Sequence, residues 1–143
     1  MVRFFRMRRI LTVVLTAIIL VAACNREPTV TYKQPPADSY TVGTRHVKIG
    51  DSIVPVDGAS VTPAFFTTIG VRPMLGRFFV DDERKTPETT VVALSYDLWK
   101  ERFDSSPAII GRTLEIDGHP ATIVGIAPKG FTLPGATLVW TPK

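Results

Sequence analysis

The apolar run from Ile10 to Ala23 limits the fold more than any other feature of the sequence, since Thr12 and Thr16 are its only residues that are not apolar. As a helix rising about 1.5 Å per residue it would span roughly 21 Å, less than the roughly 30 Å hydrocarbon core of a bilayer. Arginines precede the run and small residues end it, a pattern typical of a cleaved export signal. The folded domain is expected to begin after a linker, at about Thr44, so that about 100 of the 143 residues belong to it. That length is enough for one hydrophobic core and too short for two.

The end of this run has a second implication. Val21, Ala22 and Ala23 stand before Cys24, and these four residues resemble the lipobox of bacterial lipoproteins. The resemblance implies that residues 1–23 are a lipoprotein-type signal peptide, cleaved before Cys24, whose thiol carries a diacylglycerol. Cys24 is the only cysteine, so no disulfide can form within the chain. The alternative is an ordinary signal peptide or a short anchor with an incidental cysteine. The expected location is the cell envelope, on the extracytoplasmic, periplasmic side of a bacterial membrane.

The charge of the chain is concentrated in the same segment. The chain carries 17 Lys and Arg residues against 13 Asp and Glu residues, a formal net charge of +4. The excess is contributed by arginines that precede the apolar run, namely Arg3, Arg6, Arg8 and Arg9. The remainder is balanced and lacks the basic surface with which proteins neutralise several phosphates at once. We therefore exclude nucleic acid as a partner.

Residues 24–43 are predicted to be a flexible linker, because they are polar, contain prolines and show neither helical nor sustained alternating periodicity. The folded domain is expected over residues 44–143. Two strands are predicted on either side of a turn at Gly50 and Asp51, and Pro55 places the second of them at an edge or a bulge.

Two short helices are predicted in the middle of the domain. Thr62 is the expected cap of the first, Gly70 suits its end, and the pair Phe65 and Phe66 is expected in the core. Residues 90–95 form a continuous apolar run, as in a strand buried on both faces. Ser95 is the expected cap of the second helix, which carries an apolar stripe at helical spacing.

A β-hairpin is predicted near the C-terminal end. The segments "RTLEI" and "ATIVGIA" flank Asp117 and Gly118, a dipeptide that tolerates the positive backbone dihedrals of a tight turn. The predicted fold class is therefore α+β: a small mixed sheet with two short helices and a C-terminal β-hairpin, after an N-terminal signal segment.

No motif for nucleotide or metal binding is found. The stretch Gly70–Arg77 has five residues between its glycines and lacks the Lys followed by Ser or Thr of a phosphate-binding loop. The acidic residues Asp81, Asp82 and Glu83 adjoin Arg84 and Lys85, which favours a solvated loop that neutralises its own charge over a metal site. We therefore predict no nucleotide, no metal and no other cofactor.

A catalytic centre is not predicted either. Ser95 is not in the glycine-flanked elbow that exposes a nucleophilic serine. His46 and His119 are the only imidazoles, and no third ligand lies at a spacing typical of a metal site. An envelope hydrolase that uses Ser95 or His119 remains an alternative without a motif, and the protein is predicted not to be an enzyme.

Four blocks of sequence together resemble a known family. They are "VTPAFFTTIGVRPMLGRFF", "VVALSYDLWKERF", "PAIIGRTLEIDGHPATIVGIAPKGF" and "LVWTP", within Val61–Pro142. In order and spacing they are similar to the MacB-like periplasmic core domain of ABC transporter permeases. The resemblance implies an α+β extracytoplasmic module that meets partner proteins and does not hydrolyse ATP, which is the role of a separate nucleotide-binding domain.

The sequence also departs from that family. Further membrane-spanning segments follow the core in the family, whereas this sequence stops at Lys143 without a second apolar run. We therefore expect no transport path within the chain, and a lipid in place of the transmembrane helix that usually precedes the core. The strand at Leu138–Trp140 is expected to lack its usual neighbours, which leaves an edge open to pairing with another chain.

The predicted function is a non-enzymatic module, anchored to the membrane through Cys24, that acts by protein–protein contacts. The expected partners are a MacB-like ABC transporter permease, an efflux assembly or other envelope assembly proteins. Because Arg and aromatic residues dominate interfaces, the candidate contact residues are Arg72, Met74, Arg77, Phe131, Leu133 and Trp140. The alternatives are a free-standing ligand-binding envelope lipoprotein, and a remnant of a longer permease with no function of its own.

Overall fold

The computed structural model describes residues 30–83 and 90–143. Within it, Tyr32–Lys143 forms one compact unit, whose fold is described below. The predicted signal peptide and Cys24 lie outside the described residues. None of the helices in the described part of the chain has the length and apolar character needed to cross a membrane.

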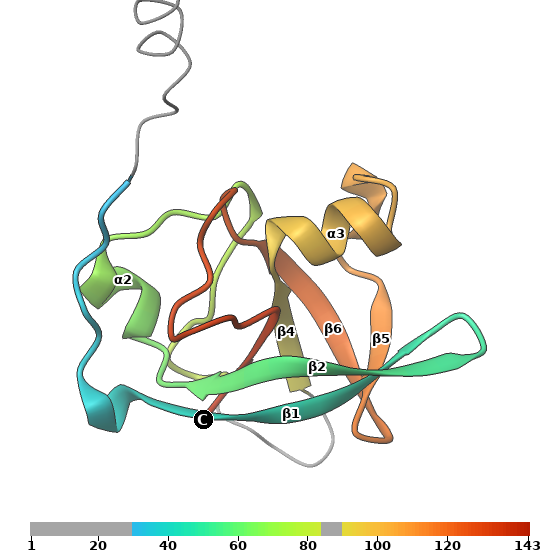
Figure 1. Ribbon diagram of the computed structural model, residues 1–143, viewed down its shortest axis with the longest axis horizontal. Coiled ribbons are helices and arrows are strands. Elements are labelled where there is room, and N and C mark those ends of the chain that lie inside the picture. The colour runs from blue at the N-terminus through green and yellow to red at the C-terminus, as the bar shows by residue number, and fades with distance from the viewer. Residues whose placement is uncertain (1–29, 84–89) are drawn as a thin grey trace, which may run out of the picture. The chain divides into compact units, whose positions relative to one another are not determined.

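The unit is a mixed α+β fold, as predicted from the sequence (Figure 1). Its sheet has seven strands, in the order β3-β6-β4-β7-β2-β1-β5. The elements along the chain are η1 (Ala37–Ser39), β1 (Tyr40–Ile49), β2 (Ser52–Val61), α2 (Phe65–Ile69), β3 (Leu75–Gly76), β4 (Thr90–Leu94), α3 (Tyr96–Arg102), η2 (Pro107–Ile109), β5 (Thr113–Ile116), β6 (His119–Ile126) and β7 (Val139–Pro142).

The sheet closes on itself, because β5 at one end of the strand order also pairs with β6. Six strands therefore form a ring, β6-β4-β7-β2-β1-β5, and the short strand β3 adds to the end of β6 beyond β5. The sheet is mixed, since β4 runs parallel to β6 and β2 runs parallel to β7, while the other pairs are antiparallel.

Alternation along the strands sends side chains into two separate cores. The inner core fills the ring, and α3 covers it with Leu98 and Trp99. Helix α3 begins directly after Ser95, because Ser95 Oγ accepts the Leu98 N–H at 3.2 Å. This is the N-cap predicted from the sequence. The strand residues of the inner core are Val47, Val56, Val92, Leu94, Leu114, Ile116, Ile123 and Val139.

The outer core lies on the other face of β2, β4, β6 and β7, where α2 packs. Phe66 is at its centre, since five other rings have centroids within 6.1 Å of its own: Phe65, Phe78, Phe79, Phe131 and Trp140. The core role predicted for Phe65 and Phe66 is confirmed. Ala93 belongs to this core while its neighbours Val92 and Leu94 belong to the inner one, so β4 is buried on both faces as predicted.

The two predicted hairpin turns are present. Asp117 and Gly118 have φ of 52° and 80°, the positive values that the turn between β5 and β6 requires. Gly50 and Asp51 join β1 to β2, which pair without a break from Tyr40 to Ile49 (Figure 1). Pro55 lies on the part of β2 that has no neighbour on its outer side, since β7 pairs only with Gly58–Val61.

Three local expectations differ from the structure. β1 begins at Tyr40, four residues before the expected start of the folded domain, and Tyr32 already packs on the Phe131 ring at 5.0 Å. Contacts with the outer core therefore order residues that look like linker. Helix α2 begins after Ala64, and no side chain caps it, so Thr62 is not its cap.

The expected open edge at Leu138–Trp140 was also wrong. Strand β7 lies inside the ring, parallel to β2 on one side and antiparallel to β4 on the other. Both of its sides are therefore paired within the chain, and its position is set by long-range pairing that local sequence does not reveal.

Candidate interaction surface

The structure divides the six predicted contact residues into two groups. Phe131 and Trp140 are 1% and 0% exposed in the outer core, and Leu133 packs against that core. The indole Nε1 of Trp140 donates to the Leu133 carbonyl at 2.8 Å, which satisfies its only polar atom. Phe131 and Trp140 therefore stabilise the fold and are not exposed, whereas Leu133 is partly buried. Trp140 is buried although it stands near the end of the chain, because β7 lies in the middle of the sheet.

The other three residues, Arg72, Met74 and Arg77, are exposed on one stretch of chain that we call segment 72–83. Backbone bonds attach it to β6, from Met74 N–H to the Ile126 carbonyl and from Arg77 N–H to the Val124 carbonyl, both at 2.8 Å.

Two glycines allow this attachment. A Cβ at Gly125 would collide with the Arg77 carbonyl oxygen, and a Cβ at Gly76 would collide with the Val124 carbonyl oxygen. Gly76 also has a φ of 69°, in the region that favours glycine. Segment 72–83 therefore runs antiparallel to β6 at backbone contact around Leu75 and Gly76, which holds it in a defined position.

An ion pair fixes the end of the segment. Arg77 donates to both carboxylate oxygens of Glu83, at 2.8 and 2.6 Å, and the Val80 N–H also bonds to that carboxylate, at 3.2 Å. The hydrogen bond from Arg77 lowers the pKa of Glu83, and the same bond raises the pKa of Arg77. Arg77 thus forms an ion pair with Glu83. Arg84 and Lys85, expected in that role, lie outside the described residues.

Two apolar side chains on the segment face solvent. Met74 is 52% exposed and Val80 is 50% exposed. A shallow groove of about 340 Å³ adjoins the segment and is lined by Gly76, Arg77, Ile110, Gly111, Thr122, Ile123 and Val124. The arrangement provides apolar contact area, two arginines and a fixed backbone, which are features of protein-binding surfaces.

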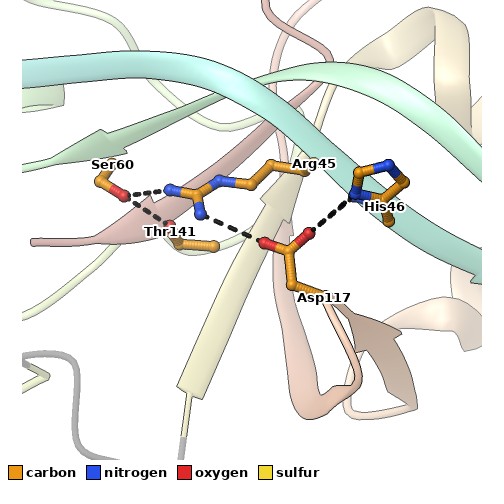
Figure 2. A network of polar contacts seen from close by, with 5 residues as sticks. All are labelled: Arg45, His46, Ser60, Asp117 and Thr141. Carbon is orange, nitrogen blue, oxygen red and sulfur yellow. Dashed lines mark hydrogen bonds and ion pairs between the residues drawn. The ribbon is translucent and has the colours of Figure 1, made fainter.

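A second cluster, shown in Figure 2, is polar. It lies beside the β5–β6 turn, at the opposite end of the ring from α3. Arg45 donates to Ser60 Oγ at 2.6 Å and to Asp117 Oδ2 at 3.2 Å, and Ser60 Oγ lies 3.2 Å from Thr141 Oγ1. The Arg45 side chain lies over Gly58, where an added Cβ would collide with it. Because Arg45 shares a strand face with Val47, it points inward and needs these partners.

Asp117 links this cluster to β1. Its Oδ1 accepts the His46 backbone N–H at 2.8 Å and lies 3.5 Å from His46 Nδ1, while its own N–H donates to the His46 carbonyl at 2.8 Å. Burial raises the pKa of the Asp117 carboxyl, but the hydrogen bonds from His46 and Arg45 outweigh it and hold that pKa below its ordinary value. This cluster was not predicted from the sequence, although an arginine between Gly43 and Val47 on the inward face of β1 is its signal.

The residues considered for chemistry lie apart. Ser95 is 2% exposed and caps α3, whereas His119 is exposed at the β5–β6 turn. The parallel register of β4 and β6 puts these residues at opposite ends of the ring, roughly 20 Å apart at about 3.3 Å per residue. They cannot act as a nucleophile and its base. No group of three or more metal-ligating side chains occurs among residues 30–83 and 90–143.

Comparison with known proteins identifies the fold. The model of the MacB-like periplasmic core domain family matches residues 11–143. The periplasmic region of MacB from Actinobacillus actinomycetemcomitans is similar at 17% identity and a TM-score of 0.58. The extracellular domain of the noncanonic ABC-type transporter YknZ from Gram-positive bacteria is similar at 13% identity and a TM-score of 0.57.

Each of these structures matches 73% of this chain, while this chain spans 46% and 52% of theirs, about half of their length. At such identities the structural likeness establishes the fold alone. No curated protein matches the chain significantly.

Proposed function

Because the chain belongs to the family of MacB-like periplasmic core domains, we propose that it is a non-enzymatic extracytoplasmic module that docks onto a MacB-like ABC transporter permease or a related envelope assembly, such as an efflux assembly. The similar solved structures support this proposal, since they are the periplasmic region of MacB and the extracellular domain of an ABC-type transporter. The distance between Ser95 and His119 supports the non-enzymatic part.

The observation that carries the proposal is the exposure of Met74 and Val80 on a backbone that is already held in place. The bidentate pair of Arg77 and Glu83 and the two bonds to β6 restrict segment 72–83 before any partner arrives. A preformed surface loses less conformational entropy on binding, so more of the contact energy is available for affinity. We assign the docking role to this segment and the adjoining groove.

A lipid on Cys24 is the proposed means of attachment. Each buried methylene of an acyl chain contributes about 0.8 kcal/mol, and two or three chains give nearly permanent membrane binding. Residues between Cys24 and the folded unit would then keep the unit near the bilayer surface.

Affinity capture from detergent-solubilised envelopes tests the docking. The full chain is expected to recover a permease component, and Met74→Asp is expected to reduce that recovery at least tenfold by placing a charge in the apolar contact. Ile53→Asp is the matched control, because Ile53 is 63% exposed on the distant β1–β2 hairpin. Recovery of the chain alone, or equal recovery by both variants, would contradict the proposal.

The anchor has its own test. Cells grown with a labelled fatty acid are expected to label the wild-type chain and not the Cys24→Ser variant, which should also leave the membrane fraction. An unlabelled wild-type chain, or a variant that stays as firmly membrane-bound, argues against lipidation without affecting the docking result.

The groove beside Arg77 also favours a second candidate, a ligand-binding envelope lipoprotein. Its volume of about 340 Å³ is near the lower limit of small-molecule sites, about 300–1,000 Å³. A ligand at about 100 times its dissociation constant would stabilise the fold by roughly 2.7 kcal/mol. A thermal-shift screen of small apolar molecules that moves the midpoint in the wild type, and less in Ile110→Asp, would support this candidate.

A further inference from the structure

The outer edge of β1 is the starting point of a separate inference. β1 and β2 are joined by a two-residue turn, so Ile49 and Ser52 form the hydrogen-bonded pair that closes the hairpin. Hydrogen-bonded and non-hydrogen-bonded pairs alternate from there. The N–H and C=O groups of Tyr40, Val42 and Thr44 therefore point away from β2, towards the outer side of β1.

Strand β5 pairs with only the C-terminal part of this edge of β1. It pairs with Val47 and Lys48. Asp117 then hydrogen-bonds to both backbone groups of His46: its carboxylate accepts the His46 N–H, and its own N–H donates to the His46 carbonyl, at 2.8 Å each. Asp117 therefore ends the ladder at His46. Within residues 30–83 and 90–143, no hydrogen bond is found for the outward groups of Tyr40, Val42 and Thr44.

This free edge lacks the features that keep edge strands from pairing. Residues 41–44 are all exposed and carry no charge, and Val42 is 59% exposed. The register along β1 has no bulge. The outer edge of β2 differs, because it carries Pro55, which has no N–H to donate. Edge strands of monomers are usually protected by charges, prolines or bulges.

We propose that this edge of β1 pairs with the same edge of a second copy of the chain, antiparallel and around a two-fold axis at Val42. In this register Val42 lies opposite Val42 of the second copy, and Tyr40 lies opposite Thr44 of the second copy. The register contains three residue pairs, and each exchanges two backbone hydrogen bonds, so about six hydrogen bonds join the two copies.

A second copy is the occupant that this edge fits best. The free stretch runs from Tyr40 to Thr44 and is centred on Val42, so two-fold pairing there uses every outward group and stops before Asp117. The exposed Val42 side chains become an apolar cross-strand pair, an arrangement that stabilises sheets. The pairing does not involve segment 72–83, so it can fail or hold independently of the docking proposed above.

Cysteine cross-linking tests the register in the full chain in isolated membranes. Directly opposite hydrogen-bonded residues have Cα atoms about 5.5 Å apart, within the range that a disulfide bridges. Val42→Cys is therefore expected to convert most of the chain to a covalent dimer under mild oxidation. Thr44→Cys is the matched control, because its copies are offset by four residues, about 13 Å, too far to bridge.

The wild type, with Cys24 alone, gives the background. Covalent dimer from Val42→Cys at least five times above that of Thr44→Cys and of the wild type supports the proposal. Equal yields from the two variants, a Val42→Cys yield at background, or an adduct of Val42→Cys with another protein in place of the homodimer each overturns it.

Sedimentation of the full chain in mild detergent is the second measurement. The wild type is expected to show a mass that rises with concentration towards that of a dimer, while Val42→Lys stays monomeric because like charges oppose each other at the axis. Ile53→Lys adds the same charge on the other strand of the hairpin and should behave as the wild type. Concentration-dependent dimers of Val42→Lys would contradict the inference.

Discussion

Removing the Asp117 carboxylate should loosen the end of the ring that lies away from α3. Two substitutions separate its roles. Asp117→Asn keeps an oxygen for the His46 N–H and tolerates the φ of 52°, but it removes the charge that Arg45 contacts. Asp117→Ala removes the acceptor as well, and alanine is strained at a positive φ.

The expected magnitudes follow from these contacts. Asp117 is 35% and Arg45 23% exposed, so solvent screens the ion pair and its loss costs roughly 0.5–1 kcal/mol. The alanine variant also loses the hydrogen bond from the His46 N–H, which costs about 1 kcal/mol. Holding alanine in the left-handed backbone conformation costs about 1 kcal/mol more. We expect unfolding free energies lower by roughly 0.5–1 kcal/mol for asparagine and roughly 2–3 kcal/mol for alanine.

The effect depends on pH with a defined sign. The pKa of Asp117 is lower in the folded than in the unfolded protein. Its contribution is therefore complete at pH values above the unfolded pKa, about 3.9, and is lost as the pH falls through the folded pKa. The wild type and Asp117→Asn should thus differ at pH 7, and the difference should shrink as the pH falls through the lowered pKa of Asp117.

Urea unfolding of residues 32–143, followed by tryptophan fluorescence, measures these values, because Trp140 is completely buried in the folded state. Midpoints should fall in the order wild type, asparagine, alanine. Unchanged midpoints in both variants, or a gap between wild type and asparagine that persists at low pH, would refute the role assigned to the carboxylate.

Further predictions concern close packing and capping, and the same urea titration measures each. Gly125→Ala should destabilise the fold by about 1–3 kcal/mol, because its Cβ meets the Arg77 carbonyl. Gly43→Ala is the control, since its Cβ has open space around it and the variant should unfold near the wild-type midpoint. Equal midpoints of the two variants would contradict the backbone contact. Trp140→Ala, followed through the fluorescence of the remaining Trp99, which is 7% exposed, should cost about 3–5 kcal/mol, as for a core aromatic, and a loss below 1 kcal/mol would mean that the residue is not in the core. Ser95→Ala should cost about 1 kcal/mol through the lost cap, and no change would argue against capping.

Features set by neighbouring residues could be predicted from the sequence. Asp117 and Gly118 suit a turn by their own conformational preferences, and Ser95 followed by an apolar helical stripe predicts a capped helix. The unbroken apolar run of β4 likewise predicts a strand between two cores. In each case the structure confirms the prediction, because the energetic reason lies within a few residues of chain.

Features set by long-range pairing could not be predicted in this way. Trp140 stands close to the chain end, and only the pairing of β7 with both β2 and β4 shows that it is buried. The same closure explains why Phe131 is core. Arg45 could have been recognised, since strand alternation puts it on the face of Val47, where a cation needs a partner. Its partner Asp117 is 72 residues away.

The docking of segment 72–83 onto a permease is tested most directly by a photo-cross-linking amino acid at Met74 in intact cells, with the adduct identified by mass spectrometry. We expect an adduct that contains an ABC transporter permease, and little or none when the cross-linker replaces Ile53, which is 63% exposed against 52% for Met74. No permease adduct from Met74, or the same adducts in equal amounts from both positions, would contradict docking through segment 72–83.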